Sequence, residues 1–210
     1  MRQRVAGIDE AGRGPLAGPV VAAAVILRPR SRIRGVADSK TLSPEDRTTL
    51  SVVIRREALC YGIGWADRAE IDALNILQAT FLAMRRALLA MSVTPHHVLV
   101  DGNRLPSLEG LGCTVTARAI IGGDATEPAI SAASILAKTA RDTYMDHMDA
   151  LYPEYSFAAH KGYGTPDHQR LLELYGPCPL HRRSFAPLRP RLAAARLDSE
   201  ALRPEPEALS

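Results

Sequence analysis

Cysteine is scarce in this chain of 210 residues, which contains only Cys60, Cys113 and Cys178. An odd number of widely separated cysteines argues against a disulfide framework, and their spacing is not that of a metal site. Proteins of the reducing cytosol use cysteine in this way. The sequence therefore predicts a cytoplasmic protein.

Long hydrophobic runs are also missing. The longest apolar stretch, residues 16–27, contains Pro19 and falls well short of the ~20 residues that a membrane helix needs. Arg2 and Arg4 resemble the basic start of a signal peptide, but charged residues interrupt the segment that follows. We therefore expect neither a signal peptide nor a membrane partner.

Lysine is the third scarce residue, because only Lys40, Lys138 and Lys161 are lysines among the 26 basic residues. A chain that uses Arg almost everywhere for positive charge keeps Lys where a compact ammonium group is wanted. We expect these three side chains to contact phosphate. Chance retention at the surface is the alternative for each, and Lys138 could instead pair with an acid inside the fold.

Charge and composition predict one domain with a tail. The hydrophobic content of 46% is ordinary for a globular core, and we assign residues 1–197 to one domain. Residues 198–210 hold four acids, one Arg and no hydrophobic periodicity, so we expect an acidic, disordered tail. The chain before the tail is therefore more basic than the overall net charge of +3, which is compatible with a polyanionic partner.

Residues 7–19 carry the densest local pattern. Asp9 and Glu10 follow a short apolar run, and a turn rich in glycine follows them, with Arg13 at its centre. Neighbouring like charges disfavour joint ionisation, and a hard cation such as Mg²⁺ or Mn²⁺ removes that penalty by binding carboxylate oxygens. The glycines let the backbone approach a phosphate closely. Taken separately, a solvated acid pair and an ordinary turn explain the same residues.

The hydrophobic pattern predicts a mixed α/β domain. Short apolar runs predict strands at residues 5–9, 20–27, 59–65, 98–100 and 114–121. Capping residues and helical spacing predict helices that start near residues 43, 67, 75, 129 and 165, and an Arg-rich last helix over residues 182–197. This order of elements gives one mixed sheet with helices packed on it.

Three of these strands lead into acidic residues, namely Asp9-Glu10, Asp101 and Asp124. Acids at the carboxyl ends of neighbouring strands converge in one crevice, where α/β folds place ligands. Carboxylates without His or Cys partners favour Mg²⁺ or Mn²⁺ over Zn²⁺. Two such ions ~3.5–4 Å apart can clamp both oxygens of a displacement at phosphorus. For each residue alone, an Asp-Gly turn at Asp101 and a helix cap at Asp124 are the alternatives.

Six segments together resemble the signature of ribonuclease HII, the prokaryotic type 2 ribonuclease H family. They occur in the expected order between about residues 5 and 188, and six in order are highly specific. They are Ile8-Asp9-Glu10-Ala11-Gly12-Arg13-Gly14-Pro15, Asp38-Ser39-Lys40, Asp101-Gly102-Asn103, Ile130-Ser131-Ala132-Ala133-Ser134-Ile135-Leu136-Ala137-Lys138, His160-Lys161-Gly162-Tyr163-Gly164-Thr165 and His181-Arg182-Arg183-Ser184-Phe185.

The resemblance implies an RNase H-like fold with a five-stranded mixed sheet, in which three antiparallel strands are joined by two parallel ones. It places the first and fourth strands side by side and adds C-terminal helices at about residues 165–197. It also implies an endonuclease that cleaves RNA paired to DNA and incises 5′ to a single ribonucleotide in duplex DNA. The products carry 3′-hydroxyl and 5′-phosphate ends. We expect a monomer, and protein partners stay open.

The resemblance also assigns roles by position. Four acids resemble the catalytic carboxylates that bind Mn²⁺ or Mg²⁺, and they are Asp9, Glu10, Asp101 and Asp124. Gly12, Arg13 and Gly14 resemble the turn that recognises the 2′-hydroxyl, the group that distinguishes RNA from DNA. Tyr163 is similar to the tyrosine that stacks on the sugar after the ribonucleotide.

Two departures from the family pattern concern Asp124. Gly122-Gly123-Asp124 replaces the usual Lys-Gly-Asp, and the spacing from Asp101 is a few residues long. We interpret residues 105–112, which are rich in Pro and Gly, as a loop insertion. Asp124 therefore has less support than the other three acids.

Three other functions share parts of this pattern. A junction resolvase or integrase would share the acids but not the Gly12-Arg13-Gly14 turn or Tyr163. A non-catalytic nucleic-acid-binding module would bind hybrids without metal-dependent cleavage. A nucleotide-binding protein fits poorly, because residues 7–18 match neither the Walker pattern nor the dinucleotide-binding one.

Overall fold

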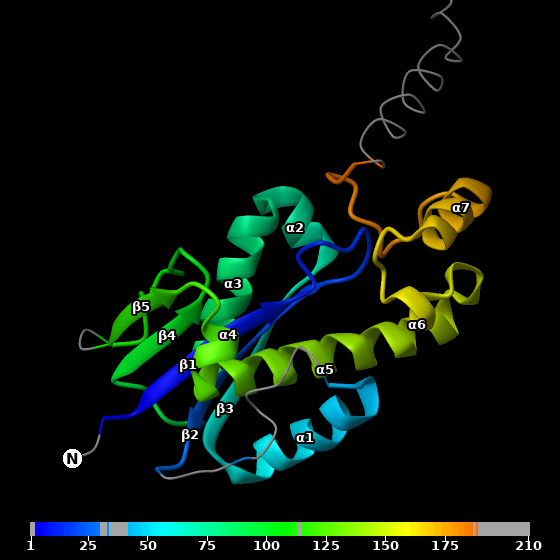
Figure 1. Ribbon diagram of the computed structural model, residues 1–210. Coiled ribbons are helices and arrows are strands. Elements are labelled where there is room, and N and C mark those ends of the chain that lie inside the picture. Colours follow the sequence, from blue (N-terminus) through cyan, green and yellow to red (C-terminus); the bar gives the residue numbers. More distant parts are fainter. Residues whose placement is uncertain (1–2, 30–32, 34–41, 113–114, 187, 189–210) are drawn as a thin grey trace, which may run out of the picture.

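The structure, a computed structural model, describes residues 3–29, 33, 42–112, 115–186 and 188 (Figure 1). A five-stranded sheet forms its centre, with the strands in the order β3-β2-β1-β4-β5. The first three strands, β1 (Val5–Ala11), β2 (Val20–Leu27) and β3 (Ala58–Ala66), pair antiparallel. β4 (His97–Asp101) pairs parallel with β1, and β5 (Thr116–Ile120) pairs parallel with β4. The predicted mixed sheet, with its first and fourth strands adjacent, is confirmed.

The helices begin where the sequence supplies capping side chains. Ser43 caps α1 (Pro44–Glu57) by accepting a hydrogen bond from the backbone N–H of Asp46 at 3.1 Å. Asp67 and Glu70 form a capping box at α2 (Arg68–Leu74), and Asn75 caps α3 (Ile76–Leu89). The later helices are α4 (Gly123–Thr126), α5 (Pro128–Leu151), α6 (Phe157–His160) and α7 (Pro166–Tyr175), with a 3₁₀ turn, η2 (Pro153–Tyr155), before α6.

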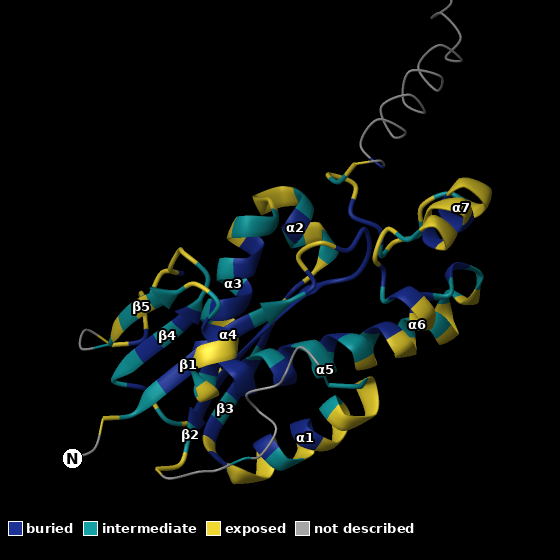
Figure 2. Cartoon of the chain, viewed as in Figure 1, coloured by how far each residue is buried: buried dark blue, intermediate teal, exposed yellow. Residues whose placement is uncertain are grey.

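Alternating side chains of β2 separate two hydrophobic layers. Ala22 and Ala24 pack in the layer that includes α3, whereas Ala23 and Val25 pack in the layer that includes α1 and α5. Figure 2 shows that the central strands are buried while α1 turns an exposed side away from the sheet. The sheet is therefore covered by helices on both faces.

A glycine in β1 sets how closely α5 approaches the sheet. A Cβ atom at Gly7 would lie 2.2 Å from the backbone nitrogen of Ile130 in the first turn of α5. Only a residue without a side chain permits this approach. It brings Ser134, one turn further along α5, within hydrogen-bonding reach of Asp9 on β1.

Two strand boundaries differ from the prediction around the acids. β1 continues to Ala11, because Glu10 and Ala11 still pair with Ala22 and Val21 of β2. The acid pair therefore lies within the strand and not at its end. β5 ends at Ile120, and Asp124 lies in the one-turn helix α4.

Residues 105–112, which we predicted to be a loop insertion, pack against α3. Leu111 is buried, and Leu108 packs against the same hydrophobic cluster as α3. The backbone oxygen of Glu109 accepts a hydrogen bond from Arg85 of α3 at 3.2 Å. The segment is therefore anchored on α3 and not a free loop.

The predicted last helix does not begin at Arg182. Residues 183–186 form turns and a bend, and the side chain of Arg182 is buried in the protein interior. Residues 189–197 and the acidic tail at 198–210 lie outside the described part of the chain. Within the described ranges, none of the helices has the length and apolar character needed to span a membrane.

Candidate active site

The four predicted acids meet where β1 and β4 run side by side. These strands pair in parallel with Ile8 opposite Val100, so the residues that follow, Asp9 and Asp101, are neighbours. Asp124 joins from α4, where its backbone N–H donates a hydrogen bond to Asp101 Oδ1 at 3.4 Å. Glu10 lines one pocket together with Asp124 and another together with Asp101. The structure therefore brings together acids that are far apart in sequence.

Burial makes ionisation of these acids costly. Asp9 is only 6% exposed, and burial, followed by the charges of Glu10 and Asp101, raises its pKa to about 8. Hydrogen bonds from Ser134 and from the backbone N–H of Glu10 act in the opposite direction. Burial also raises the pKa of Glu10, although the guanidinium of Arg13, 3.2 Å away, opposes the rise. These carboxylates resist joint ionisation unless a cation binds them.

This oxygen donor set fits a hard divalent cation. Across the part of the chain that is described, no three His, Cys, Asp or Glu side chains are arranged to hold a metal ion alone. Mg²⁺ does not need such a cage, because it keeps several waters and commonly takes only one or two carboxylates together with substrate phosphate. A cation among the acids would also offset the burial and the repulsion by Glu10 that together raise the pKa of Asp9.

The glycine turn after β1 is held from the protein interior by Arg182. The Arg182 side chain is fully buried. Its guanidinium donates hydrogen bonds of 2.5–3.2 Å to the carbonyl oxygens of Gly12, Arg13, Pro15, Gly18 and Pro19. Gly12 has φ of +94°, and a Cβ atom there would lie 2.1 Å from Arg141 Nε. Glycine is therefore required at this position by both backbone conformation and space.

Tyr163 lies beside this turn. Its ring is close enough that Cε1 would be 3.8 Å from a Cβ atom at Gly14, and the residue is 42% exposed. Lys138 Nζ and Arg141 Cζ lie 5.7 and 5.8 Å from the ring centroid. The ring is thus a partly exposed flat surface, flanked by cations, next to the glycine turn.

The three lysines have different positions. Lys138 Nζ donates a hydrogen bond to Asp142 at 2.7 Å, and Lys138 also lines the pocket beside Tyr163. Lys138 therefore pairs with an acid of its own helix in a partly exposed ion pair, and its predicted contact with phosphate stays a prediction. Lys161 pairs with Asp146 and is not among the residues that line this pocket. Lys40 lies outside the described residues.

The residues that form this site lie within a sequence pattern that matches a known family over most of the chain. The sequence model of the ribonuclease HII family matches residues 6–188. The chain belongs to the ribonuclease HII family. As a member, it is a hydrolase, an endoribonuclease of the ribonuclease H type, as the resemblance predicted.

Known proteins agree in sequence and in fold. Ribonuclease HII of Verminephrobacter eiseniae (strain EF01-2) is 58% identical over 191 residues, which are 91% of this chain and 89% of that protein. The crystal structure of ribonuclease H2 from Pyrococcus horikoshii OT3 matches with a TM-score of 0.78 at 29% identity, covering 92% of this chain and 99% of that one. Bst-RNase HIII, crystallised in complex with Mn²⁺, shares the fold at 18% identity with a TM-score of 0.66, covering 93% and 71% of the two chains.

In this ribonuclease HII fold, two pockets flank the ion pair of Glu10 and Arg13. The first, of about 320 Å³, is lined by Glu10, Ala11, Gly12, Arg13, Gly14, Arg47, Asp124, Ser134, Ile135, Lys138 and Tyr163. The second, of about 240 Å³, is lined by Glu10, Arg13, residues 101–104 and, from α3, Leu77, Thr80, Phe81 and Met84. Glu10 and Arg13 therefore line both hollows, with Asp124 in the first and Asp101 in the second.

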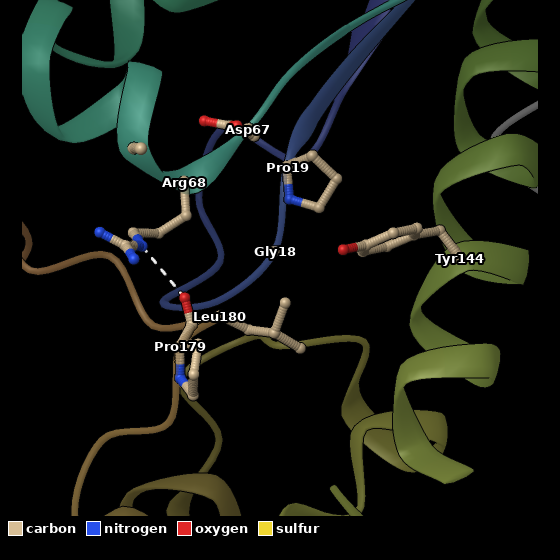
Figure 3. Close-up of a pocket in the computed structure, with 8 residues that line it drawn as sticks. Gly18, Pro19, Asp67, Arg68, Tyr144, Pro179 and Leu180 are labelled. Atoms are coloured by element: carbon tan, nitrogen blue, oxygen red, sulfur yellow. Dashed lines mark hydrogen bonds between the residues drawn. The ribbon is translucent and has the colours of Figure 1, made fainter. Parts of the chain in front are cut away.

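A third pocket, of about 160 Å³, lies away from the acids and is lined by none of the predicted site residues (Figure 3). The Tyr144 hydroxyl points into it from α5, opposite Arg68 at the start of α2. Arg68 Nε donates a hydrogen bond to the carbonyl oxygen of Pro179 at 3.0 Å. The pocket therefore lies where Gly18 and Pro19, at the end of the glycine turn, face Pro179 and Leu180 of the C-terminal segment.

Sequence reasoning missed three side chains that shape the site. Ser134 and Arg182 lie in quoted family segments, but their types gave no reason to assign them a role. Arg141, also fully buried, donates hydrogen bonds to the carbonyl oxygens of Pro19 and Ala17 at 3.0 and 3.1 Å. One signal could have indicated it, because an Arg on the apolar side of a helix needs a buried partner.

Proposed function

We propose that this enzyme cleaves the RNA strand of RNA–DNA hybrids and incises duplex DNA on the 5′ side of a single embedded ribonucleotide, leaving 3′-hydroxyl and 5′-phosphate ends. One observation carries the proposal. Glu10 and Asp124 share a pocket with the Gly12-Arg13-Gly14 turn and Tyr163. Groups suited to cutting a phosphodiester therefore lie within one hollow with groups suited to reading a sugar.

Asp9, Glu10, Asp101 and Asp124 would hold two Mg²⁺ or Mn²⁺ ions. Bound there, such ions supply Lewis-acid stabilisation of the attacking and leaving oxygens at phosphorus. The raised pKa values of Asp9 and Glu10 support this role, because buried acids that repel one another gain most from a cation. The Ser134 hydrogen bond to Asp9 favours the ionised form that a cation requires.

The turn and Tyr163 would select the position of the cut. Arg182 engages the carbonyl groups of Gly12 and Arg13 from inside. A sugar hydroxyl in the pocket would therefore meet the turn through its N–H groups, and we assign recognition of the 2′-hydroxyl to residues 12–14. The ring of Tyr163 would stack on the sugar that follows the ribonucleotide. Lys138, which lines the same pocket, would contact a phosphate.

A labelled duplex with one ribonucleotide tests the proposal. We expect a single nick on its 5′ side with Mg²⁺ or Mn²⁺, no nick with a chelator, and no nick in the matched all-DNA duplex. Equal cutting of the all-DNA duplex would contradict the substrate assignment and favour a resolvase or integrase activity. Tight binding of the hybrid without cleavage in any divalent metal would favour a non-catalytic binding module.

A further inference from the structure

Three histidines lie buried behind the segment that carries Tyr163. The exposed fractions of His160, His168 and His181 are 9%, 0% and 1%. His160 ends α6, His168 lies in α7, and His181 precedes Arg182 in the C-terminal segment. None of them lines the pocket between the acids and Tyr163, so any part they have in recognition is indirect.

The hydrogen bonds of this cluster determine where each ring carries its proton. The backbone N–H of Cys178 donates to His181 Nδ1 at 3.0 Å, so neutral His181 is protonated on Nε2. That Nε2 lies 3.0 Å from His168 Nε2 and donates to it. His168 is therefore protonated on Nδ1, which donates to the carbonyl oxygen of Tyr163 at 2.8 Å.

His160 holds the same segment through further hydrogen bonds. Its ring stacks on that of His168, with centroids 4.2 Å apart and an angle of 13° between the planes. Its Nδ1 accepts a hydrogen bond from the backbone N–H of Gly162, and its Nε2 donates to the carbonyl oxygen of Tyr155. Its own carbonyl oxygen accepts from the backbone N–H of Tyr163 at 2.9 Å. Both backbone polar groups of Tyr163 are thus bonded to histidines.

This arrangement requires neutral rings. A second proton on His168 would sit on Nε2 and set N–H against N–H across the 3.0 Å contact with His181. A second proton on His181 would sit on Nδ1 and face the backbone N–H of Cys178. Burial, together with neighbouring histidines, lowers the pKa of His168 and lowers that of His181 to about 4. The titratable groups around the pair are His160, Asp167, Cys178 and Tyr155. Both rings are therefore neutral near pH 7.

We propose that His168 and His181 are positioning residues for substrate recognition, which hold the backbone of Tyr163 so that its ring stands at the pocket beside Gly14. The inference rests on the proposed function of Tyr163. His181 acts through His168, because its Nε2–H fixes the tautomer in which His168 donates to residue 163.

A metal site is the other use of such a cluster, since Cys178 Sγ lies 3.2 Å from His181 Nδ1. Every ring nitrogen of the three histidines already has a protein partner, and these are backbone groups or another ring. A metal would have to displace those hydrogen bonds. The satisfied network favours positioning.

A double-mutant cycle tests the proposal with the single-ribonucleotide duplex. We expect His168→Leu to raise KM about tenfold and to change kcat less than about threefold, because the lost hydrogen bond orients a binding group. His168→Asn, whose amide can still donate to the carbonyl of Tyr163, recovers most of the loss. In the Tyr163→Ala background, His168→Leu causes no further rise in KM. His147→Leu, an exposed histidine of α5, is the matched control with unchanged KM.

The cycle separates positioning from a general stabilising role, whose loss would lower the melting temperature equally in both backgrounds. Equal rises in KM in both backgrounds would overturn the proposal. Nitrogen-15 NMR of the histidine rings adds a readout without activity, with the proton expected on Nδ1 of His168 and on Nε2 of His181. A proton on any other ring nitrogen of these two residues would refute the positioning role and leave the proposed function untouched. A wild-type enzyme that nicks no ribonucleotide duplex would instead refute the proposed function, and the positioning with it.

Discussion

Arg182 donates a hydrogen bond to the carbonyl oxygen of Gly12 across 170 residues of sequence. Its guanidinium is fully buried and binds four further carbonyl groups of the same turn. Burial, with the nearby charge of Arg141, lowers the pKa of Arg182 to about 9, so it is still charged near pH 7. The C-terminal segment therefore holds the glycine turn in place through this one side chain.

Replacing Arg182 should show how much its hydrogen bonds to the glycine turn contribute to stability, compared with the loss of an exposed arginine. We expect Arg182→Met to lower the free energy of unfolding by about 3 kcal/mol or more, because several buried carbonyl groups lose their donor. Arg183→Met, at an exposed neighbour, should change it by less than about 0.5 kcal/mol. Urea denaturation of both variants measures the difference. Equal effects would mean that the hydrogen bonds to the turn contribute nothing specific.

Local chemistry made much of this molecule predictable. The caps at Ser43 and Asp67 act on residues three positions away, so sequence alone reveals them. The closeness of Asp9 and Asp101 was predictable because their strands are parallel neighbours, although Asp9 lies within β1 and not at its end.

Support from distant segments was not predictable in the same way. Arg182 and Arg141 bind main-chain carbonyl groups, which every residue has, so no complementary side-chain pattern marks their partners. The histidine cluster has the same cause, since His168 bonds the carbonyl oxygen of Tyr163. The short helix that carries Asp124 follows a turn at Gly122, which is in the left-handed region, and the alternation that defines a strand gives no signal there.

The stability of the metal-free protein should fall with rising pH because of Asp9. Its pKa is raised from 3.8 to about 8 in the folded state, so folding favours the protonated form. The stabilising contribution is therefore complete below about pH 4 and is lost as the pH rises to about 8. Asp9→Asn, which stays neutral, should lack this loss and be more stable than wild type at pH 8 in a chelator. Chemical denaturation at pH 5 and pH 8 checks the sign, and a wild-type advantage at pH 8 would contradict it.

Removal of one carboxylate should separate cleavage from binding. We expect Asp101→Asn to lower the nicking rate at least about a thousandfold, because the site loses charge that a cation needs. Affinity for the single-ribonucleotide duplex in a chelator should change less than about threefold, since the glycine turn and Tyr163 are intact. Nicking and fluorescence anisotropy on the same duplex measure both. Full activity would refute the metal assignment of Asp101.

Two lysines with similar partners should differ in nucleic-acid binding. Lys138 and Lys161 each pair with an Asp of α5, namely Asp142 and Asp146. Only Lys138 lines the pocket that contains Tyr163, so Lys161 is a matched control for loss of a paired surface cation. A lysine that contacts phosphate releases condensed counterions when the duplex binds, and its loss lowers the salt dependence of binding.

We therefore expect Lys138→Ala to reduce the slope of log K against log salt concentration by about 1, and to weaken binding of ribonucleotide and all-DNA duplexes alike. Lys161→Ala should leave the slope within about 0.3 of wild type by the same relation. Anisotropy titrations between low and moderate salt give both slopes. A Lys138→Ala slope equal to that of wild type would mean that Lys138 only pairs with Asp142 and does not contact phosphate, because a structural ion pair has no counterions to release from the duplex.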